Sequence, residues 1–397
     1  MKISLPIKSL MQPSFVSMAA VLASLAAWLF PSFGVFEKGY DNPSRVDLTA
    51  VVVLSSWYLL IFMTFTLGQK LGGLAIFHRK AHKSSLFDLK SNLIYYCFTV
   101  VSTIGIATQL AIIFRSLSLQ EAIAFISLGE TNELKDALYS DYSIGFVSLR
   151  YVVLYSASIA LYRIIRCRQF TLINISNVLM LALSTFLSFR LIFIATLLTT
   201  VFILSFGRKT LQISVPKLVI SGAFLFLILS LLNFSRNADY YGRNNESFGT
   251  ASVSEILKYL GSPFQAEITS ARVTDQLVAG GIDAYRKYVV EDINLMTNSA
   301  FVGLHQQMGY FCWAYVALLC LFMGFIFEAL ASLGRTIFLL PCGAILYASA
   351  ELWRLDLFQQ GTFIVWFVIG VGLPVFMIVG QRLLVFIGSL RKVSLAS

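Results

Sequence analysis

Long apolar runs separated by polar connections extend from one end of the chain to the other. A helix needs about 20 mostly apolar residues to cross the hydrocarbon core of a bilayer. Ten runs come close to that length or exceed it, so the pattern predicts an all-α protein, a polytopic bundle of ten transmembrane helices. The runs cover residues 14–30, 48–67, 93–114, 144–162, 170–187, 190–206, 217–234, 306–327, 336–352 and 360–380.

Lysine and arginine fall mainly in alternate connections between these runs. If the N-terminus lies inside, the inner segments carry 17 lysines and arginines and only two acidic residues. An excess of basic residues marks the cytoplasmic side of a membrane protein. The sequence therefore predicts that both termini face the cytoplasm. The inner segments are residues 1–13, 69–92, 163–169, 207–217, 328–335 and 381–397.

One polar segment, residues 235–302, is the longest connection and falls on the outer side. Residues 252–255 (Ser-Val-Ser-Glu) have the spacing of a capping box, and residues 262–265 (Ser-Pro-Phe-Gln) repeat it with proline in the first helical position. Gly261 stands where it would end the first helix. We therefore expect two short helices, packed on the membrane surface or on the bundle.

These boundaries divide the chain into three parts. Residues 1–234 hold the first seven spans, residues 235–302 form the large outer loop, and residues 303–397 hold the last three spans and a cytoplasmic tail. The outer loop and the helix ends around it are the part of the chain in which we expect chemistry.

The composition supports the membrane class independently. Hydrophobic residues make up 57% of the 397 positions and charged residues 13%, whereas a soluble domain carries about 25% charged residues. The net charge of +10 is explained by the basic inner segments, so we expect no nucleic acid among the partners.

Several motifs of nucleotide and hydrolase chemistry are missing from the chain. It contains no P-loop, no Gly-x-Gly-x-x-Gly, no Asp-x-Asp of nucleotide-sugar sites and no nucleophile elbow. His78 and His82 lie four residues apart but have no third ligand, and the five cysteines show no metal-binding spacing. We therefore expect neither a metal nor a cofactor, and ATP-driven transport is disfavoured.

Five of the arginines near the predicted outer face are candidates for a function. Arg150 lies about six residues inside the outer end of the fourth run, where a charge either serves function or anchors the helix by snorkelling. Arg190 sits in the tight turn between the fifth and sixth runs. Arg236 and Arg243 follow the seventh run, and Arg272 lies on the second expected loop helix. Guanidinium groups bind phosphate bidentately, so the set predicts an anion site, although loop arginines can also be simply solvated.

Two tyrosines accompany the arginines at the start of the outer loop. Tyr240 and Tyr241 lie between Arg236 and Arg243. Aromatic rings present an apolar face beside a polar group, which suits the flat face of a sugar. The combination of cations and aromatic rings is therefore a candidate binding site for a phosphorylated saccharide.

Groups that could transfer a proton lie in the same region. The candidate carboxylates of the loop are Asp239, Glu267, Asp275 and Asp283, among others in the segment. Any of them could act as a general base, or could pair with an arginine, as Arg272 and Asp275 would at three residues' spacing. His305, at the mouth of the eighth run, could also accept a proton near neutral pH. Glu351 and Arg354 are three residues apart and are expected to form an ion pair.

Three short stretches resemble segments of the bacterial O-antigen (oligosaccharide repeat unit) polymerases of the Wzy type. Residues 188–190 (Ser-Phe-Arg) are similar to the Ser-x-Arg at a short outer turn of that family. Residues 259–263 (Tyr-Leu-Gly-Ser-Pro) resemble the tyrosine-to-proline segment of its large loop, and residues 294–298 with Gly309 resemble the lead into its next span. The likeness covers about residues 170–380, and Gln307 departs from it where an acid is expected.

The resemblance implies an activity at the periplasmic face of the bacterial inner membrane. Such enzymes transfer a growing chain from undecaprenyl diphosphate to the terminal sugar of a new lipid-linked unit. The partners it implies are the undecaprenyl-diphosphate-linked oligosaccharide, membrane lipid and a chain-length regulator protein. The expected catalytic residues are Arg190, Arg236, Arg243, Arg272, Glu267 and His305. The expected substrate-binding residues are Arg150, Tyr240, Tyr241 and Tyr259.

Two other functions remain open from the sequence. An O-antigen ligase would use the same lipid-linked donor but would transfer it to the lipid A core. A flippase would move the same lipid without chemistry, but such transporters usually have more spans and lack a large outer loop. The three functions differ in the product that accumulates when the protein is missing.

Overall fold

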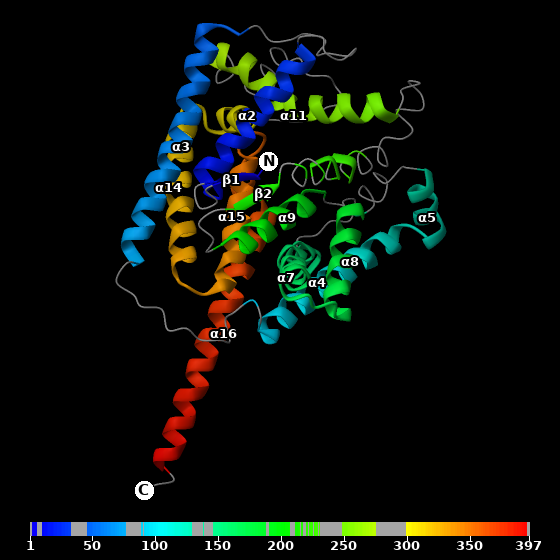
Figure 1. Ribbon diagram of the computed structural model, residues 1–397, viewed down its shortest axis with the longest axis vertical. Coiled ribbons are helices and arrows are strands. Elements are labelled where there is room, and N and C mark those ends of the chain that lie inside the picture. Colours follow the sequence, from blue (N-terminus) through cyan, green and yellow to red (C-terminus); the bar gives the residue numbers. More distant parts are fainter. Residues whose placement is uncertain are drawn as a thin grey trace.

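The computed structural model of the chain is almost entirely helical (Figure 1). It describes residues 2–5, 10–32, 46–76, 91–128, 146–187, 190–206, 211–214, 248–274 and 299–394, and isolated positions between them (89, 138, 216, 220, 222–224, 226–228 and 230). In chain order the helices, with η for 3-10 helix, are α2 (Pro13–Ser32), α3 (Leu48–Ile76), α4 (Asn92–Ser116), α5 (Leu119–Leu128), η2 (Phe146–Val152), α7 (Val153–Cys167), α8 (Leu172–Leu187), α9 (Arg190–Ser205), α11 (Phe248–Arg272), α13 (Ala300–Met308), α14 (Phe311–Ser332), η3 (Thr336–Phe338), α15 (Leu339–Glu351), η4 (Leu357–Gln359) and α16 (Gly361–Ser394).

Five of the described helices are long and apolar enough to cross a membrane. They correspond to α3, α4, η2 with α7, α14 and α16. Four shorter apolar helices accompany them, in α2, α8, α9 and η3 with α15. The seventh apolar run lies largely outside the described residues. The architecture is that of an all-α, membrane-embedded protein, as the apolar runs predict.

Helices α3 and α14 pack extensively on each other, and glycine allows their close approach. A Cβ atom added at Gly68 would lie 2.1 Å from the carbonyl oxygen of Leu321, and one at Gly324 would lie 2.6 Å from that of Phe65. Such distances are far inside van der Waals contact, so only glycine fits at these positions. One turn further along α3, a Cβ atom at Gly72 would lie 2.4 Å from the carbonyl oxygen of Phe325, which is one turn beyond Leu321. Because both positions advance together, α3 and α14 run parallel.

The helices α4, η2, α7, α8 and α9 form the neighbouring part of the bundle. The fourth apolar run, expected as one α-helix, begins as the 3-10 helix η2 and continues as α7. Gly105 of α4 explains the close approach of η2, because a Cβ atom there would lie 2.0 Å from the backbone nitrogen of Arg150. The backbone of η2 therefore packs directly on α4.

The outer-loop helix α11 corrects the prediction of two short helices. It is one continuous helix with Pro263 inside it, and neither Gly261 nor residues 262–265 interrupt it. Figure 1 shows α11 as a bent helix across one end of the bundle. A proline within a helix removes a hydrogen bond, and a serine of a neighbouring helix can bind a carbonyl near the break. Here Ser24 Oγ of α2 donates to Leu260 O, 2.7 Å away.

The start of the eighth apolar run is also different from the prediction. Residues 306–327 were expected as one span, but the helix is interrupted at Gly309, which separates α13 from α14. Gly309 has a φ of 56°, a left-handed conformation that glycine adopts without steric cost. The short helix α13 is therefore free to take its own direction above α14.

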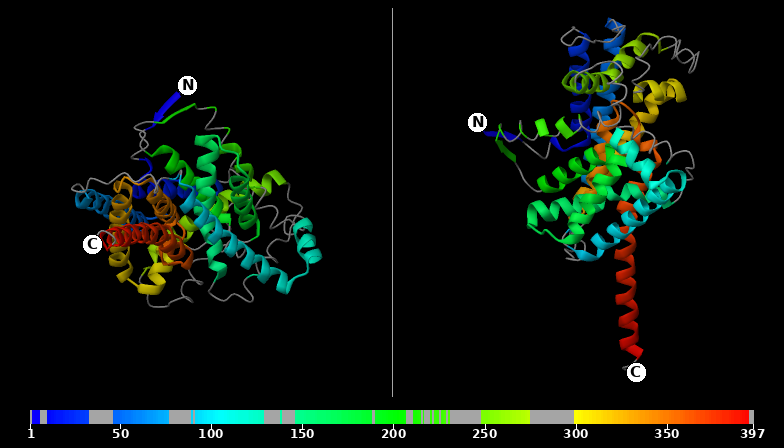
Figure 2. Two further views of the ribbon diagram at one scale, coloured as in Figure 1. Left: turned by 90° about the horizontal axis from the view of Figure 1, so that it is seen from below. Right: turned by 90° about the vertical axis from the view of Figure 1, so that its right-hand side faces the viewer.

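A two-stranded sheet was not expected from the apolar runs. Strands β1 (Lys2–Leu5) and β2 (Leu211–Ser214) pair antiparallel, with Ile3 opposite Ile213. Both segments alternate apolar and polar residues, which is the strand period. Figure 2 shows the pair projecting from the side of the bundle, near the N-terminus.

Candidate functional site

Helix α11 is held on α2 by polar contacts as well as by apolar packing. Trp28 Nε1 donates to Gln265 Oε1 at 2.6 Å, and the rings of Trp28 and Phe264 lie 5.7 Å apart. Ala266 and Ile268 of α11 are also buried. These contacts make α11 part of the bundle rather than a surface loop, and they fix the direction of its polar side chains.

The second half of α11 contacts the first part of α3. Glu267 contacts Tyr58, whereas Arg272, five residues later, contacts Asp47 at the beginning of α3. Residues that are distant in the sequence therefore form one polar row along these two helices. Two of the expected catalytic residues, Glu267 and Arg272, belong to this row.

Glu267 is the chemically most unusual residue of the row. Its side chain is 1% exposed. Its Oε1 accepts a hydrogen bond from the Tyr58 hydroxyl at 2.6 Å and another from the Ser299 hydroxyl at 2.5 Å. Glu267 belongs to α11 and Tyr58 to α3, and Ser299 is the residue that precedes α13. The carboxyl group is therefore held at the junction of three helices.

The second carboxyl oxygen of Glu267, Oε2, differs from Oε1 in its hydrogen bonding. Within the part of the chain that the structure describes, Oε2 is buried and has no hydrogen-bond partner. Burial raises the pKa of Glu267 to about 8, although the hydrogen bonds from Ser299 and Tyr58 oppose the change. A buried oxygen that lacks a partner is exceptional in native proteins, and strongly shifted carboxyl groups concentrate at functional sites.

This arrangement suits proton transfer. A general acid or base works best when its pKa lies near the working pH, and at pH 7 roughly a tenth of the Glu267 carboxyl groups would be ionised if the pKa is about 8. The free oxygen can then take a proton from a hydroxyl group that reaches it. The position of Glu267 is therefore that of a candidate general base.

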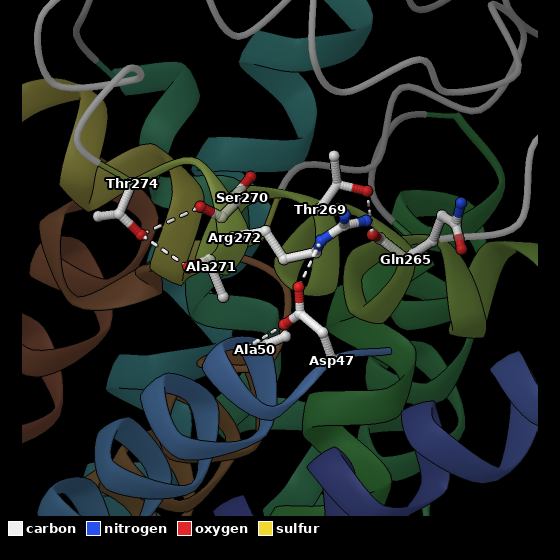
Figure 3. Close-up of polar contacts among 8 residues, drawn as sticks. All are labelled: Asp47, Ala50, Gln265, Thr269, Ser270, Ala271, Arg272 and Thr274. Carbon is white, nitrogen blue, oxygen red and sulfur yellow. Dashed lines mark hydrogen bonds and ion pairs between the residues drawn. The ribbon is translucent and has the colours of Figure 1, made fainter. Parts of the chain in front are cut away.

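Arg272 lies at the end of the same row, beside Asp47 (Figure 3). Its Nε donates to Asp47 Oδ2 at 2.8 Å, and about 40% of each side chain remains exposed (39% and 43%). The other oxygen of Asp47 accepts from Ala50 N at 2.8 Å and so caps α3. An exposed pair of this kind contributes less than about 1 kcal/mol, so a stronger anion could compete for the guanidinium group. The alternative partner Asp275 lies outside the described residues.

Tyr259, an expected substrate-binding residue, is positioned by a buried ion pair. Arg354 Nη1 donates to the Tyr259 hydroxyl, and its guanidinium carbon lies 5.4 Å from the centre of that ring. Arg354 Nη2 also contacts Glu351 Oε2 at 2.6 Å, which confirms the expected pair. Tyr259 is 37% exposed, so it can contact a ligand while its hydroxyl group stays bound to Arg354.

His305 is enclosed by aromatic side chains. One ring nitrogen, Nδ1, lies 2.8 Å from Phe301 O, and the other, Nε2, accepts from Trp313 Nε1 at 3.2 Å. The ring centres of His305 and Trp57 are 5.7 Å apart. Burial lowers the pKa of His305, which favours the neutral ring. Both nitrogens are engaged, so the geometry suits the packing of α13 on α14, and its catalytic role stays a prediction.

Arg150 lies in another part of the bundle. It is fully buried in η2 and donates from Nη2 to the Tyr151 hydroxyl at 2.8 Å. Its guanidinium carbon lies 4.7 Å from the centre of the Tyr151 ring. A side chain that is 0% exposed does not snorkel, so the anchoring alternative is wrong. Since η2 packs on α4 and α16 whereas α11 packs on α2, α3 and α13, Arg150 is not part of the Glu267 row.

The other expected site residues lie outside the described residues. Arg190 begins α9, but its side chain is not among those described. The same holds for the start of the outer loop, with Arg236, Tyr240, Tyr241 and Arg243. The predictions for these five residues stay predictions.

Two residues of the site, Tyr58 and Ser299, and one contact, that of Arg354 with Tyr259, were not predicted from the sequence. Tyr58 stands inside an apolar run, where tyrosine is common. Ser299 precedes a short helix whose first turn it caps, accepting from Phe301 N at 3.1 Å, and this cap position was the available signal. Arg354 was expected to do no more than pair with Glu351. Their relation to α11 arises only when the helices pack.

Comparison with known proteins adds nothing to this site: no family model, no curated protein and no solved structure matches the chain.

Proposed function

We propose that the chain is a glycosyltransferase that polymerises undecaprenyl-diphosphate-linked oligosaccharide repeat units into O-antigen polysaccharide. It would act at the periplasmic face of the bacterial inner membrane, as a bundle of about ten spans with both termini in the cytoplasm. The single observation that carries the proposal is Glu267, a buried carboxyl group with a pKa near 8, one oxygen of which has no hydrogen-bond partner among the described residues. The resemblance of residues 188–190 and 259–263 to that family supplies the substrate class.

Contacts between segments on the expected outer side support the proposed topology. Arg272 of the large loop pairs with Asp47 of the first outer connection. Tyr259 of the large loop binds Arg354, which follows the ninth apolar run. Both contacts join segments that the distribution of basic residues assigns to the periplasm.

Contacts on the expected inner side agree with the same topology. Arg163 Nη2, at the end of α7, donates to Ser91 O at 2.8 Å, and its Nη1 donates to Asn92 Oδ1 at 2.9 Å. Strands β1 and β2 join the N-terminal segment to the connection after α9. The paired segments all belong to the basic, inner set, and the parallel packing of α3 on α14 fits two spans that both run inward.

The chemistry proceeds by displacement at the donor sugar. Glu267 Oε2 takes the proton from the acceptor hydroxyl group while the oxygen of that hydroxyl group forms a bond to C1 of the donor sugar. The bond from C1 to the diphosphate oxygen breaks, and its electron pair leaves with the lipid diphosphate. Arg272 faces the developing negative charge, together with the arginines proposed from the sequence, and the proton passes from Glu267 to water. Stabilising the charge that develops in the transition state is the largest contribution in many enzymes.

The test is a deletion strain that carries the wild-type gene or the Glu267→Gln variant. Glutamine keeps the shape of the side chain but cannot accept the proton, so we expect lipopolysaccharide with a single repeat unit and an unchanged amount of protein in the membrane. The control is Glu328→Gln in α14, away from α11, which should give the full ladder of chain lengths.

Three results would contradict the proposal. A full ladder of chain lengths in the Glu267→Gln strain shows that Glu267 is not the general base. Core without any repeat unit in the deletion strain indicates a ligase. Repeat units that accumulate on the inner leaflet of the deletion strain indicate a flippase.

A further inference from the structure

The two hydrogen bonds to Glu267 both end on the same oxygen. Tyr58 and Ser299 reach Oε1 from opposite parts of the chain, 209 and 32 residues away in sequence. Oε2 receives none from the described residues. The two oxygens of a carboxylate are chemically equivalent in water, so this difference is produced entirely by the fold.

We propose that Tyr58 and Ser299 are positioning residues, which hold Oε1 of Glu267 and thereby make Oε2 the oxygen that receives the acceptor proton. This inference rests on the proposed function and adds two residues to it. Neither side chain needs to touch the substrate. Their effect is to prevent rotation of the carboxyl group and to keep its free oxygen aimed at one place.

The hydrogen-bond pattern at Ser299 determines the direction of its proton. Ser299 Oγ accepts from Phe301 N at 3.1 Å, as an N-cap residue does. Its own hydrogen therefore remains available for Glu267 Oε1. The Tyr58 hydroxyl, buried in α3, lies 2.6 Å from the same oxygen, within the range of O–H···O⁻ bonds to an ionised group. Both partners thus stabilise the ionised carboxylate.

Within the part of the chain that the structure describes, these two groups are the main polar influence on Glu267. From α3 the titratable side chain facing it is Tyr58, and from α13 it is met by Ser299. On the α2 side, Trp28 binds Gln265 rather than the carboxylate. Burial raises the pKa of Glu267, and the hydrogen bonds from Ser299 and Tyr58 are the effects that lower it. Losing either bond should therefore make the base harder to ionise.

The experiment measures the pH profile of polymerisation with purified full-length protein in liposomes and a lipid-linked repeat unit. In the wild type the rate should rise with pH through about 8. Tyr58→Phe should move this midpoint upward by about one pH unit, which lowers the rate at pH 7 about tenfold. Ser299→Ala should behave alike, and Ser299→Thr, which keeps the hydroxyl, should restore the wild-type profile.

Ser270→Ala is the matched control. Ser270 is buried on α11 one turn from Glu267, and its hydroxyl has no hydrogen-bond partner among the described residues. Removing it should leave the midpoint unchanged. If Tyr58→Phe and Ser299→Ala lower the rate equally at every pH and leave the midpoint in place, the positioning role is wrong.

An infrared titration separates this inference from the proposed function. The protonated Glu267 carboxyl should give a carbonyl band that is missing in Glu267→Gln, and its midpoint can be followed without any turnover. A wild-type protein that does not polymerise refutes the proposed function, whereas the band still reports on Tyr58 and Ser299. A band midpoint that is the same in wild type and Tyr58→Phe refutes the inference.

Discussion

Replacing Glu267 with glutamine should stabilise the protein at alkaline pH. In the folded chain the carboxyl group is buried, with a pKa of about 8 in place of its ordinary 4.5. The folded state therefore keeps a proton that the unfolded chain has already lost above pH 4.5. As the pH rises towards 8, the unfolded state becomes relatively more favourable, and the free energy of unfolding falls. Glutamine carries no titrating proton and removes this dependence.

The size of the effect follows from the difference between the two pKa values. A separation of about 3.5 pH units, at about 1.4 kcal/mol each, corresponds to at most about 5 kcal/mol. The wild type should lose this stability gradually between pH 4.5 and 8 and lose no more above pH 8. The Glu267→Gln variant should match the wild type near pH 4.5 and exceed it increasingly up to pH 8.

The assay is thermal unfolding of both proteins in the same detergent between pH 5 and 9, with Glu328→Gln as the control. The difference in midpoint temperature between Glu267→Gln and wild type should grow with pH, and the control should follow the wild type. Parallel curves for Glu267→Gln and wild type over the whole range would show that Glu267 is not buried as a proton-holding group. That result would also remove the physical basis for Glu267 as the base.

Three further outcomes are expected. Gly68→Ala should destabilise the protein by about 1–3 kcal/mol, seen as a lower midpoint of thermal unfolding, because the new methyl group meets a backbone oxygen of α14 at 2.1 Å; Gly73→Ala, whose methyl group would have ordinary contact at 3.7 Å, should not. Arg272→Ala should change stability by less than about 1 kcal/mol, because its ion pair is exposed, yet should shorten the polysaccharide in a lipopolysaccharide gel; a full ladder would exclude a role in diphosphate binding. Glu351→Gln should cost about 3–5 kcal/mol, because it leaves the Arg354 charge buried without its acid; an unchanged unfolding midpoint would show that Arg354 finds another partner.

The apolar runs and the charges between them determined the class of the protein. A segment that lies in hydrocarbon must be apolar and must satisfy its backbone hydrogen bonds internally. Each such helix can therefore be recognised from its own sequence. Helices α2, α3, α4 and α16 accordingly begin within one residue of the predicted positions, although α3 and α16 continue beyond the predicted ends. The ion pair of Glu351 with Arg354 is local in the same sense, because three residues along a helix bring two side chains together.

Sequence signals for helix ends gave wrong predictions where a tertiary contact supports the helix, because these signals assume that no such contact exists. The signals at Gly261 and Pro263 would end a helix in water, but in α11 the contact of Ser24 with Leu260 O supports the bend and the helix continues. The break at Gly309 is the opposite case. Glycine is common within apolar runs, and the sequence around Gly309 does not predict whether its backbone adopts a positive φ angle.

The candidate site shows the same division most clearly. Glu267 was one of several candidate loop carboxylates in the sequence, and nothing local distinguished it from the others. Its pKa depends on burial, and its free oxygen depends on Tyr58 and Ser299, which are distant in the chain. Desolvation and hydrogen bonding are properties of an assembled junction of three helices, so only the tertiary structure could decide which carboxyl group is able to hold a proton near neutral pH.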